Sequence, residues 1–175
     1  MSKKIILFML LTLVGMGVVW MGYSAIQKIA MKKQVAESLK SMPVFKVNNL
    51  DSTQIKLQGN TPTAIIYFNT DCDHCQYEAT QIQKNMAKFN NAQLLLLSIE
   101  PLVNIRKFIK TYRLEGFSNL QVGQITGKTA VETFGFKSVP HILIYNADNQ
   151  LVREYKGETK IEAILKYLAP KRRSP

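Results

Sequence analysis

The sequence predicts an α/β domain with a mixed central β-sheet flanked by helices. Short apolar runs typical of buried strands alternate with helical patterns through the middle of the chain. The last third contains two strand-like runs joined by a short turn. Alternating strands and helices give parallel strands, whereas a hairpin adds an antiparallel pair, so the sheet is expected to be mixed.

The N-terminal segment is expected to be a transmembrane anchor. Residues 5–26 carry no formal charge, are mostly apolar, and are flanked by lysines on both sides. This length is close to the roughly 20 residues that cross a bilayer and exceeds the core of a cleaved signal peptide, about 7 to 15 residues, which is the alternative. We therefore expect a basic N-terminus, an anchor, a polar stalk, a folded domain and a basic tail, over residues 1–4, 5–26, 27–42, 43–169 and 170–175.

The folded domain is expected to begin with a β-hairpin. Residues 44–47 and 54–57 alternate apolar and polar side chains on either side of a turn at residues 48–51. The next run, residues 63–69, is β-branched, aromatic and almost continuously apolar, as in a strand buried on both faces. A helix should follow, because its apolar stripe recurs at steps of three and four residues. The stripe consists of Cys75, Ala79, Ile82, Met86 and Phe89.

Strand and helix patterns alternate through the rest of the domain. A second buried strand is predicted over residues 93–99, an amphipathic helix over residues 102–112 and a short third strand over residues 120–122. A small helix around residues 130–134 should precede a hairpin and a last amphipathic helix. The hairpin strands are expected at residues 141–146 and 151–155, and the helix carries Ile161, Ile164, Leu165 and Leu168.

The two cysteines of the chain, Cys72 and Cys75, lie at the predicted junction of the first buried strand and its helix. A Cys-x-x-Cys that contains every cysteine of a chain indicates redox chemistry or metal binding. The free N–H groups and the dipole at a helix N-terminus stabilise a thiolate, so we expect Cys72 to be the attacking nucleophile. Cys75 faces the core and is expected to resolve the mixed disulfide.

Three nearby residues are expected to modulate the cysteines. A protonated His74 would stabilise a thiolate, whereas Asp73 would oppose it. The alternatives are an exposed loop histidine and an aspartate that merely caps the helix. Glu78 is either a proton acceptor near Cys75 or a solvated helix carboxylate.

This pattern resembles the thioredoxin-like superfamily, in which a Cys-x-x-Cys faces a cis-proline loop. The segment Thr70-Asp71-Cys72-Asp73-His74-Cys75 opens a helix, and Ser138-Val139-Pro140 stands directly before a predicted strand. With the hairpin, the anchor and Glu78, the chain is similar to the TlpA/ResA-like branch of membrane-anchored bacterial thiol–disulfide oxidoreductases, over roughly residues 43–169.

The resemblance implies roles for the site residues and an identity for the partners. Cys72 would be the nucleophile and Cys75 the resolving thiol, while Val139 and the cis-proline Pro140 would hold a substrate strand. The Cys72–Cys75 disulfide would serve in place of a cofactor. The partners would be protein thiols or disulfides, an unidentified membrane or soluble electron donor, and the membrane itself, with cytochrome c maturation as one task.

The membrane side and the direction of electron flow do not follow from these motifs. Lysines flank the anchor on both sides, so charge bias does not orient it. An extracytoplasmic, periplasmic domain is expected because substrate cysteines become oxidised there. The chain also departs from the family, which usually has Trp before the first cysteine and often Pro between the two. Asp71 and Asp73-His74 stand there instead, which leaves both an oxidant and a reductant open.

Charge and motifs weigh against other functions. The formal net charge is +11, but much of the excess lies in the two tails and no aromatic-interleaved basic patch indicates nucleic-acid binding. A copper- or zinc-binding chaperone that uses the cysteines with His141 is the main alternative. A peroxiredoxin-type peroxidase is disfavoured, because its Pro-x-x-x-Thr-x-x-Cys pattern is missing from the sequence.

Overall fold

The computed structural model describes residues 3–50, 55 and 60–168, with side chains from residue 12 onward. It divides into two compact units, Met1–Glu37 and Ser38–Pro175. The first unit is helical, and the second contains the sheet and the two cysteines.

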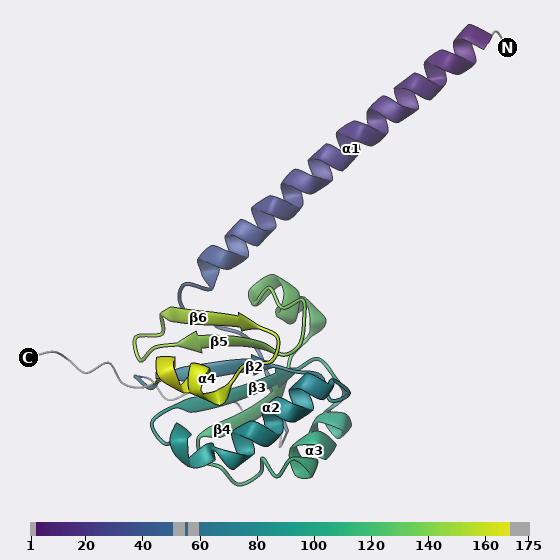
Figure 1. Ribbon diagram of the computed structural model, residues 1–175. Helices are drawn as coiled ribbons and strands as arrows, with labels where there is room; N and C mark the ends of the chain where they lie inside the picture. The colour runs from purple at the N-terminus through teal and green to yellow at the C-terminus, as the bar shows by residue number, and fades with distance from the viewer. Residues whose placement is uncertain (1–2, 51–54, 56–59, 169–175) are drawn as a thin grey trace, which may run out of the picture. The chain divides into compact units, whose positions relative to one another are not determined.

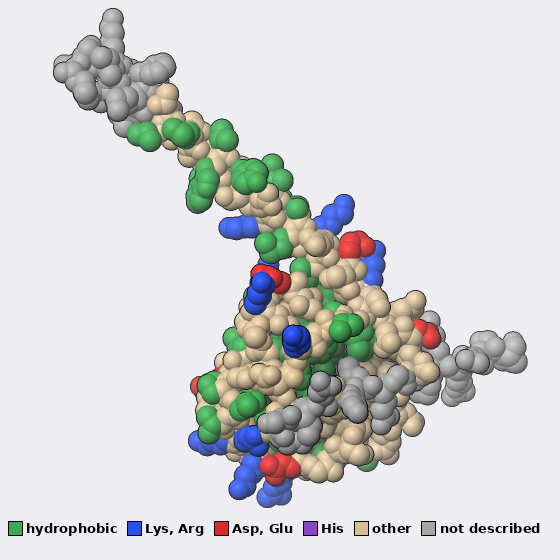
Figure 2. All heavy atoms as spheres, turned by 180° about the vertical axis from the view of Figure 1, so that it is seen from behind, with side chains coloured by type: hydrophobic (Ala, Val, Ile, Leu, Met, Phe, Trp, Pro, Cys, Tyr) green, Lys and Arg blue, Asp and Glu red, His purple; other side chains and the backbone are tan. Residues whose placement is uncertain are grey.

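Helix α1 (Lys3–Ser38) runs without interruption through most of the predicted anchor and stalk. Many of its described side chains are large, apolar and exposed, as the green side chains along the helix in Figure 2 show. Among the residues with described side chains, no helix is both long enough and apolar enough to cross a membrane. The first part of the predicted span, residues 5–11, lies outside those residues.

The second unit is built on a mixed sheet with the strand order β1-β4-β3-β2-β5-β6 (Figure 1). The three central strands are parallel, while the strands at both sides are antiparallel to their neighbours. The mixed α/β sheet that the sequence predicts is therefore confirmed. The strands are β1 (Asn48–Asn49), β2 (Thr63–Tyr67), β3 (Gln93–Ser98), β4 (Leu120–Gln124), β5 (His141–Tyr145) and β6 (Leu151–Lys156).

One face of the sheet is covered by helices α2, α3 and α4 (Figure 1). Their apolar side chains form a single core with alternate residues of the strands, because successive strand residues point to opposite faces. The three helices are α2 (Asp73–Lys84), α3 (Leu102–Thr111) and α4 (Ile161–Leu168).

The other face carries a row of aromatic side chains that includes Phe134, the residue directly after the short π-helical turn η2 (Thr129–Thr133). Phe45 contacts Phe134 edge to face, Phe134 stacks on Phe136, and Phe136 stacks on Tyr67 of β2. Strands β2, β3 and β5 are therefore buried on both faces, as their continuous apolar runs predict.

The predicted N-terminal hairpin is wrong in its first arm. Residues 44–47 belong to no strand, and most of the second arm, residues 54–57, lies outside the described part of the chain. The short strand β1 pairs with β4 instead. A methyl group at Gly123 of β4 would lie 2.9 Å from the side chains of both Val47 and Ile55, so these apolar residues pack onto β4 in the space that the glycine leaves.

The helix after β2 ends earlier than its apolar stripe predicts. Helix α2 stops at Lys84, and a 3₁₀ turn, η1 (Met86–Phe89), follows. All five residues of the stripe are nevertheless buried. A 3₁₀ turn keeps residues three apart on one side, so the stripe continues into the core after the α-helix has ended.

Candidate active site

The Cys-x-x-Cys motif lies at the N-terminus of α2, just beyond the end of β2. Cys72 is the N-cap residue, and its Sγ accepts a hydrogen bond from the Cys75 N–H at 3.4 Å. This bond satisfies one of the free donors of the first turn and places the positive end of the helix at the sulfur. Cys72 is partly exposed, Cys75 is buried, and both thiols are free. A substrate can therefore reach Cys72 directly, whereas Cys75 lies behind it.

The loop of Val139 and Pro140 faces Cys72. The Val139–Pro140 peptide bond is cis, and the Cys72 thiol donates a long hydrogen bond to the Val139 carbonyl at 3.9 Å. Pro140 precedes β5, which pairs with β2 next to the motif. Neighbouring strands thus bring together two segments that are far apart in the sequence, as the resemblance implies.

Glu78 lies in the interior beneath Cys75. Its side chain is only 1% exposed, and neither carboxylate oxygen has a hydrogen-bond partner among the described residues. Glu78, Cys75 and Pro140 line the same small cavity, and the other described lining residues are apolar. These are Ile66, Phe68, Ala79, Ile82, Leu96 and Phe108. The interpretation of Glu78 as a solvated helix carboxylate is therefore wrong.

Burial changes the acid–base properties of both inner groups. Burial raises the pKa of Glu78 to about 8, and the negative charge of Glu158 adds to the effect. Burial likewise raises the pKa of the Cys75 thiol well above its usual range. At neutral pH, both groups therefore hold their protons in the reduced protein.

His74 is exposed and bonded to Glu158. The distance from His74 Nδ1 to Glu158 Oε2 is 2.7 Å, and 68% of the His74 side chain is accessible. Glu158 lies in the turn between β6 and α4. Nothing in the sequence indicates this contact, because the two residues are 84 positions apart. Asp73 is exposed in the first turn of α2, where a carboxylate interacts favourably with the helix dipole.

His141, the additional ligand in the metal-binding alternative, is buried against other partners. Its Nε2 lies 2.8 Å from Glu154 Oε1, and its ring contacts Phe136 edge to face. Burial lowers the pKa of His141 and outweighs the opposing effect of Glu154. Across the described residues, no group of three or more His, Cys, Asp or Glu side chains is arranged to hold a metal ion. The described residues therefore do not assemble the cysteine–histidine site of the metal-binding alternative.

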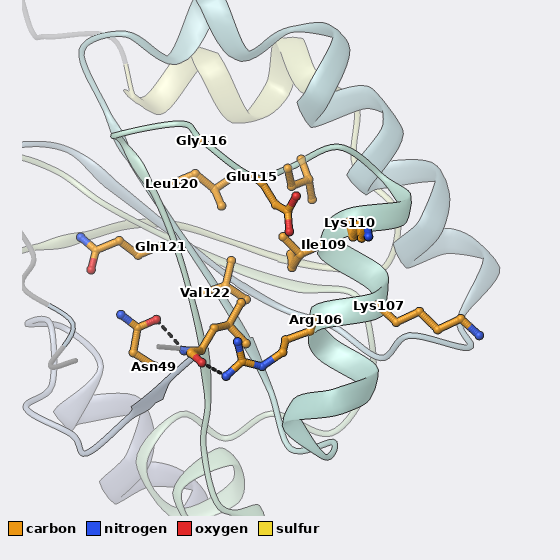
Figure 3. A pocket seen from close by; sticks show the side chains of 12 residues that line it. Asn49, Arg106, Lys107, Ile109, Lys110, Glu115, Gly116, Leu120, Gln121 and Val122 are labelled. Carbon is orange, nitrogen blue, oxygen red and sulfur yellow. Dashed lines mark hydrogen bonds between the residues drawn. The ribbon is translucent and has the colours of Figure 1, made fainter. Parts of the chain in front are cut away.

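Two hollows lie beside α3. The groove in Figure 3 has an apolar floor that includes Leu120 and Val122 and a basic rim that includes Arg106 and Lys110. Its described lining contains none of the predicted site residues. A smaller, more polar hollow reaches the motif, since Asp71 lines it. The chemistry therefore centres on the motif and the cavity beneath it.

Comparisons with known proteins agree with this geometry. The model of the AhpC/TSA family matches residues 39–166. The thiol-disulfide oxidoreductase ResA of Bacillus thuringiensis subsp. konkukian is 24% identical over 174 residues, which cover 96% of this chain and 97% of that protein.

Two solved structures show the same fold. StoA from Bacillus subtilis matches with a TM-score of 0.59 and 13% identity, over 73% of this chain and 98% of that one. A secreted Mycobacterium tuberculosis disulfide oxidoreductase homologous to E. coli DsbE matches with a TM-score of 0.60 and 14% identity, over 76% of this chain and 97% of that one. The thioredoxin-like fold and the TlpA/ResA-like resemblance are thereby confirmed.

Proposed function

Because the chain belongs to the AhpC/TSA family and is a thioredoxin-like thiol–disulfide oxidoreductase, we propose that its Cys72–Cys75 pair exchanges electrons with extracytoplasmic protein thiols. One observation carries the proposal: an accessible cysteine caps a helix opposite the Val139 carbonyl, and its partner cysteine lies buried one turn behind it. Attack by an outer sulfur followed by resolution from an inner one requires this order.

The reaction has two exchanges. In the reducing direction, the Cys72 thiolate attacks a substrate disulfide, which forms a mixed disulfide and releases the second substrate sulfur as a thiolate that takes up a proton. Cys75 then loses its proton and attacks Cys72 Sγ, so that the Cys72–Cys75 disulfide forms and the first substrate sulfur leaves. The same steps in reverse donate a disulfide to a dithiol substrate.

The surrounding residues have distinct roles in this proposal. Once deprotonated, Glu78 accepts the Cys75 proton during resolution, since the two groups line one cavity and no other described ionisable residue lines it. Val139 and Pro140 hold the substrate strand beside Cys72. Asp73 and His74 modulate the negative charge that develops on the Cys72 sulfur.

We also propose that residues 5–26 tether the enzyme to a membrane with its folded domain on the extracytoplasmic side. The support is the uncharged sequence of this segment and the exposed apolar side chains of α1. The described part of α1 does not by itself reach the length and apolar character of a membrane span. Deletion of residues 5–26 should move the protein from the carbonate-resistant membrane fraction to the soluble fraction.

Thiols that become oxidised outside the cytoplasm are the proposed substrates, and apocytochrome c is one of them. The electron donor is then a membrane or soluble dithiol protein. Deletion of the gene should lower the amount of haem-bound cytochrome c, and added dithiothreitol should restore it if the enzyme acts as a reductant. Unchanged cytochrome c together with misoxidised exported proteins would instead indicate general thiol repair.

Replacement of each cysteine tests the exchange itself. Cys72→Ser should abolish reduction of insulin disulfides, whereas Cys75→Ser should accumulate mixed disulfides that appear on non-reducing gels and disappear with dithiothreitol. Hydrogen peroxide serves as the control oxidant. A peroxidase would consume it in the presence of dithiothreitol, whereas the proposed enzyme should not. Full disulfide reductase activity in Cys72→Ser would contradict the proposal.

A further inference from the structure

The turn between β6 and α4 touches both halves of the site. The Gly157 N–H donates a hydrogen bond to the Pro140 carbonyl at 2.8 Å. The next residue, Glu158, bonds His74 at 2.7 Å. Gly157 has a φ of +99°, a conformation that L-residues rarely adopt, so the shape of this turn depends on the glycine. Two consecutive residues of one turn therefore join the cis-proline loop to the segment between the cysteines.

Glu158 also acts on the buried side of the motif. Its negative charge is the one charge–charge effect that contributes to the raised pKa of Glu78. Cys75 is the other ionisable group in the described lining of the cavity that holds Glu78. The exposed Glu158 carboxylate therefore contacts His74 directly and acts on the buried Glu78 through its charge.

We propose that Glu158 is a positioning residue that holds His74 beside the motif and, through its negative charge, lowers the reduction potential of the Cys72–Cys75 pair. The assignment rests on the proposed thiol–disulfide exchange. A negative charge beside the motif disfavours the thiolate form of Cys72 and hence the reduced pair. Its bond to His74 places the Glu158 carboxylate beside the segment between the cysteines, so its charge shifts the pair toward the disulfide and makes the enzyme a stronger reductant.

The reduction potential of purified variants, equilibrated in glutathione buffers, tests the assignment. Glu158→Gln keeps a hydrogen-bonding group and removes the charge, so the potential should rise by about 15 to 30 mV, roughly a three- to tenfold change in the equilibrium constant. Glu158→Asp keeps the charge and should shift the potential less. Glu162→Gln, which removes an exposed carboxylate in the first turn of α4, is the matched control and should leave it unchanged.

A double-mutant cycle tests the route through His74. In a His74→Gln background, Glu158→Gln should raise the potential by less than in the wild type, because the ring that holds the Glu158 carboxylate beside the motif is already gone. A second readout is the release of glutathione from a Cys72–glutathione mixed disulfide. Its rate should reach half of its maximum at a lower pH in Glu158→Gln than in the wild type. Among the described residues, Cys75 shares the cavity of Glu78 and Glu158 acts on Glu78 through its charge, so removal of that charge makes Glu78 easier to deprotonate.

The outcomes separate this assignment from the proposed function. A functional pair whose potential is the same in wild type and Glu158→Gln would overturn the role of Glu158 and leave the exchange reaction intact. Equal shifts in Glu158→Asp and Glu158→Gln would also overturn it, because the charge would then not be the cause. A wild-type pair that forms no disulfide in any glutathione buffer would overturn the proposed function and this assignment together.

Discussion

The rim of the site and the interior of the domain contain the same three residue types in opposite environments. Burial disfavours charge, so the buried cysteine and glutamate hold their protons while the buried histidine stays neutral at pH 7. The other member of each pair lies at the rim of the site, in contact with water. The rim contains Cys72, His74 and Glu158, and the interior contains Cys75, His141 and Glu78. Burial, more than residue type, thus separates the groups that start the chemistry from those that hold protons.

The largest expected difference is between the two cysteines. In the folded, reduced protein, iodoacetamide should alkylate Cys72 about a thousandfold faster than Cys75 at pH 7, because Cys75 is 2% exposed and burial disfavours its thiolate. Quantitative mass spectrometry of the two alkylated sites measures the ratio. In urea the two rates should become similar, which serves as the control. Comparable rates in the folded protein would remove the distinction between an outer and an inner sulfur.

The next largest effect is expected at Glu78, the buried glutamate of the comparison. Above about pH 8, Glu78→Gln should slow the resolving step about a hundredfold, since Cys75 then lacks a proton acceptor. The wild-type rate should rise as the pH passes about 8, where Glu78 loses its proton, and the variant should lack this rise. Glutathione release from a Cys72–glutathione mixed disulfide measures the step directly.

Glu132→Gln is the matched control for this experiment, because Glu132 is an exposed carboxylate in η2. Its resolving rate and pH profile should match those of the wild type. If Glu78→Gln resolved the mixed disulfide at the wild-type rate, the buried carboxyl group would have no part in proton transfer.

Local sequence patterns predict most of the sheet and the central motif. The strand at residues 63–69 and the apolar stripe from Cys75 carry their signal within a few residues, so the sequence indicates both the junction and the buried position of Cys75. The prediction of a hairpin strand at residues 44–47 is wrong for the opposite reason. Its alternating pattern fits a strand, but the space beside Gly123 in a distant strand decides where Val47 packs.

The parts of the site that depend on long-range contacts do not follow from the sequence. A glutamate three residues after Cys75 fits either an exposed or a buried position, because distant segments, among them Phe108 of α3 and the Pro140 loop, decide which side of α2 is covered. Glu158 carries no motif, and only the turn after β6 brings it to His74. Pairing between distant segments thus supplies the electrostatic surroundings of a motif that is itself easy to recognise.

The two histidines should differ mainly in how much they contribute to the free energy of unfolding. This is the smallest of the three expected effects. His141→Gln should lower the free energy of unfolding by about 2 kcal/mol at pH 7.5, because His141 is buried and bonded to Glu154. His74→Gln, at an exposed position, should change it by less than about 0.5 kcal/mol. Urea unfolding of the reduced proteins measures both values.

The pH dependence of this difference tests whether burial or the Glu154 carboxylate has the larger effect on the pKa of His141. The unfolded chain binds a proton on this residue near pH 6.5, whereas burial lowers the pKa in the folded protein. The wild type should therefore lose stability as the pH falls below about 6.5, and His141→Gln should lack that loss, so the gap between them should narrow from pH 7.5 to pH 5. Glu154 favours the protonated ring, and Lys156 opposes it. A gap that widens toward pH 5 would mean that Glu154 outweighs burial and raises the pKa of His141 instead of lowering it.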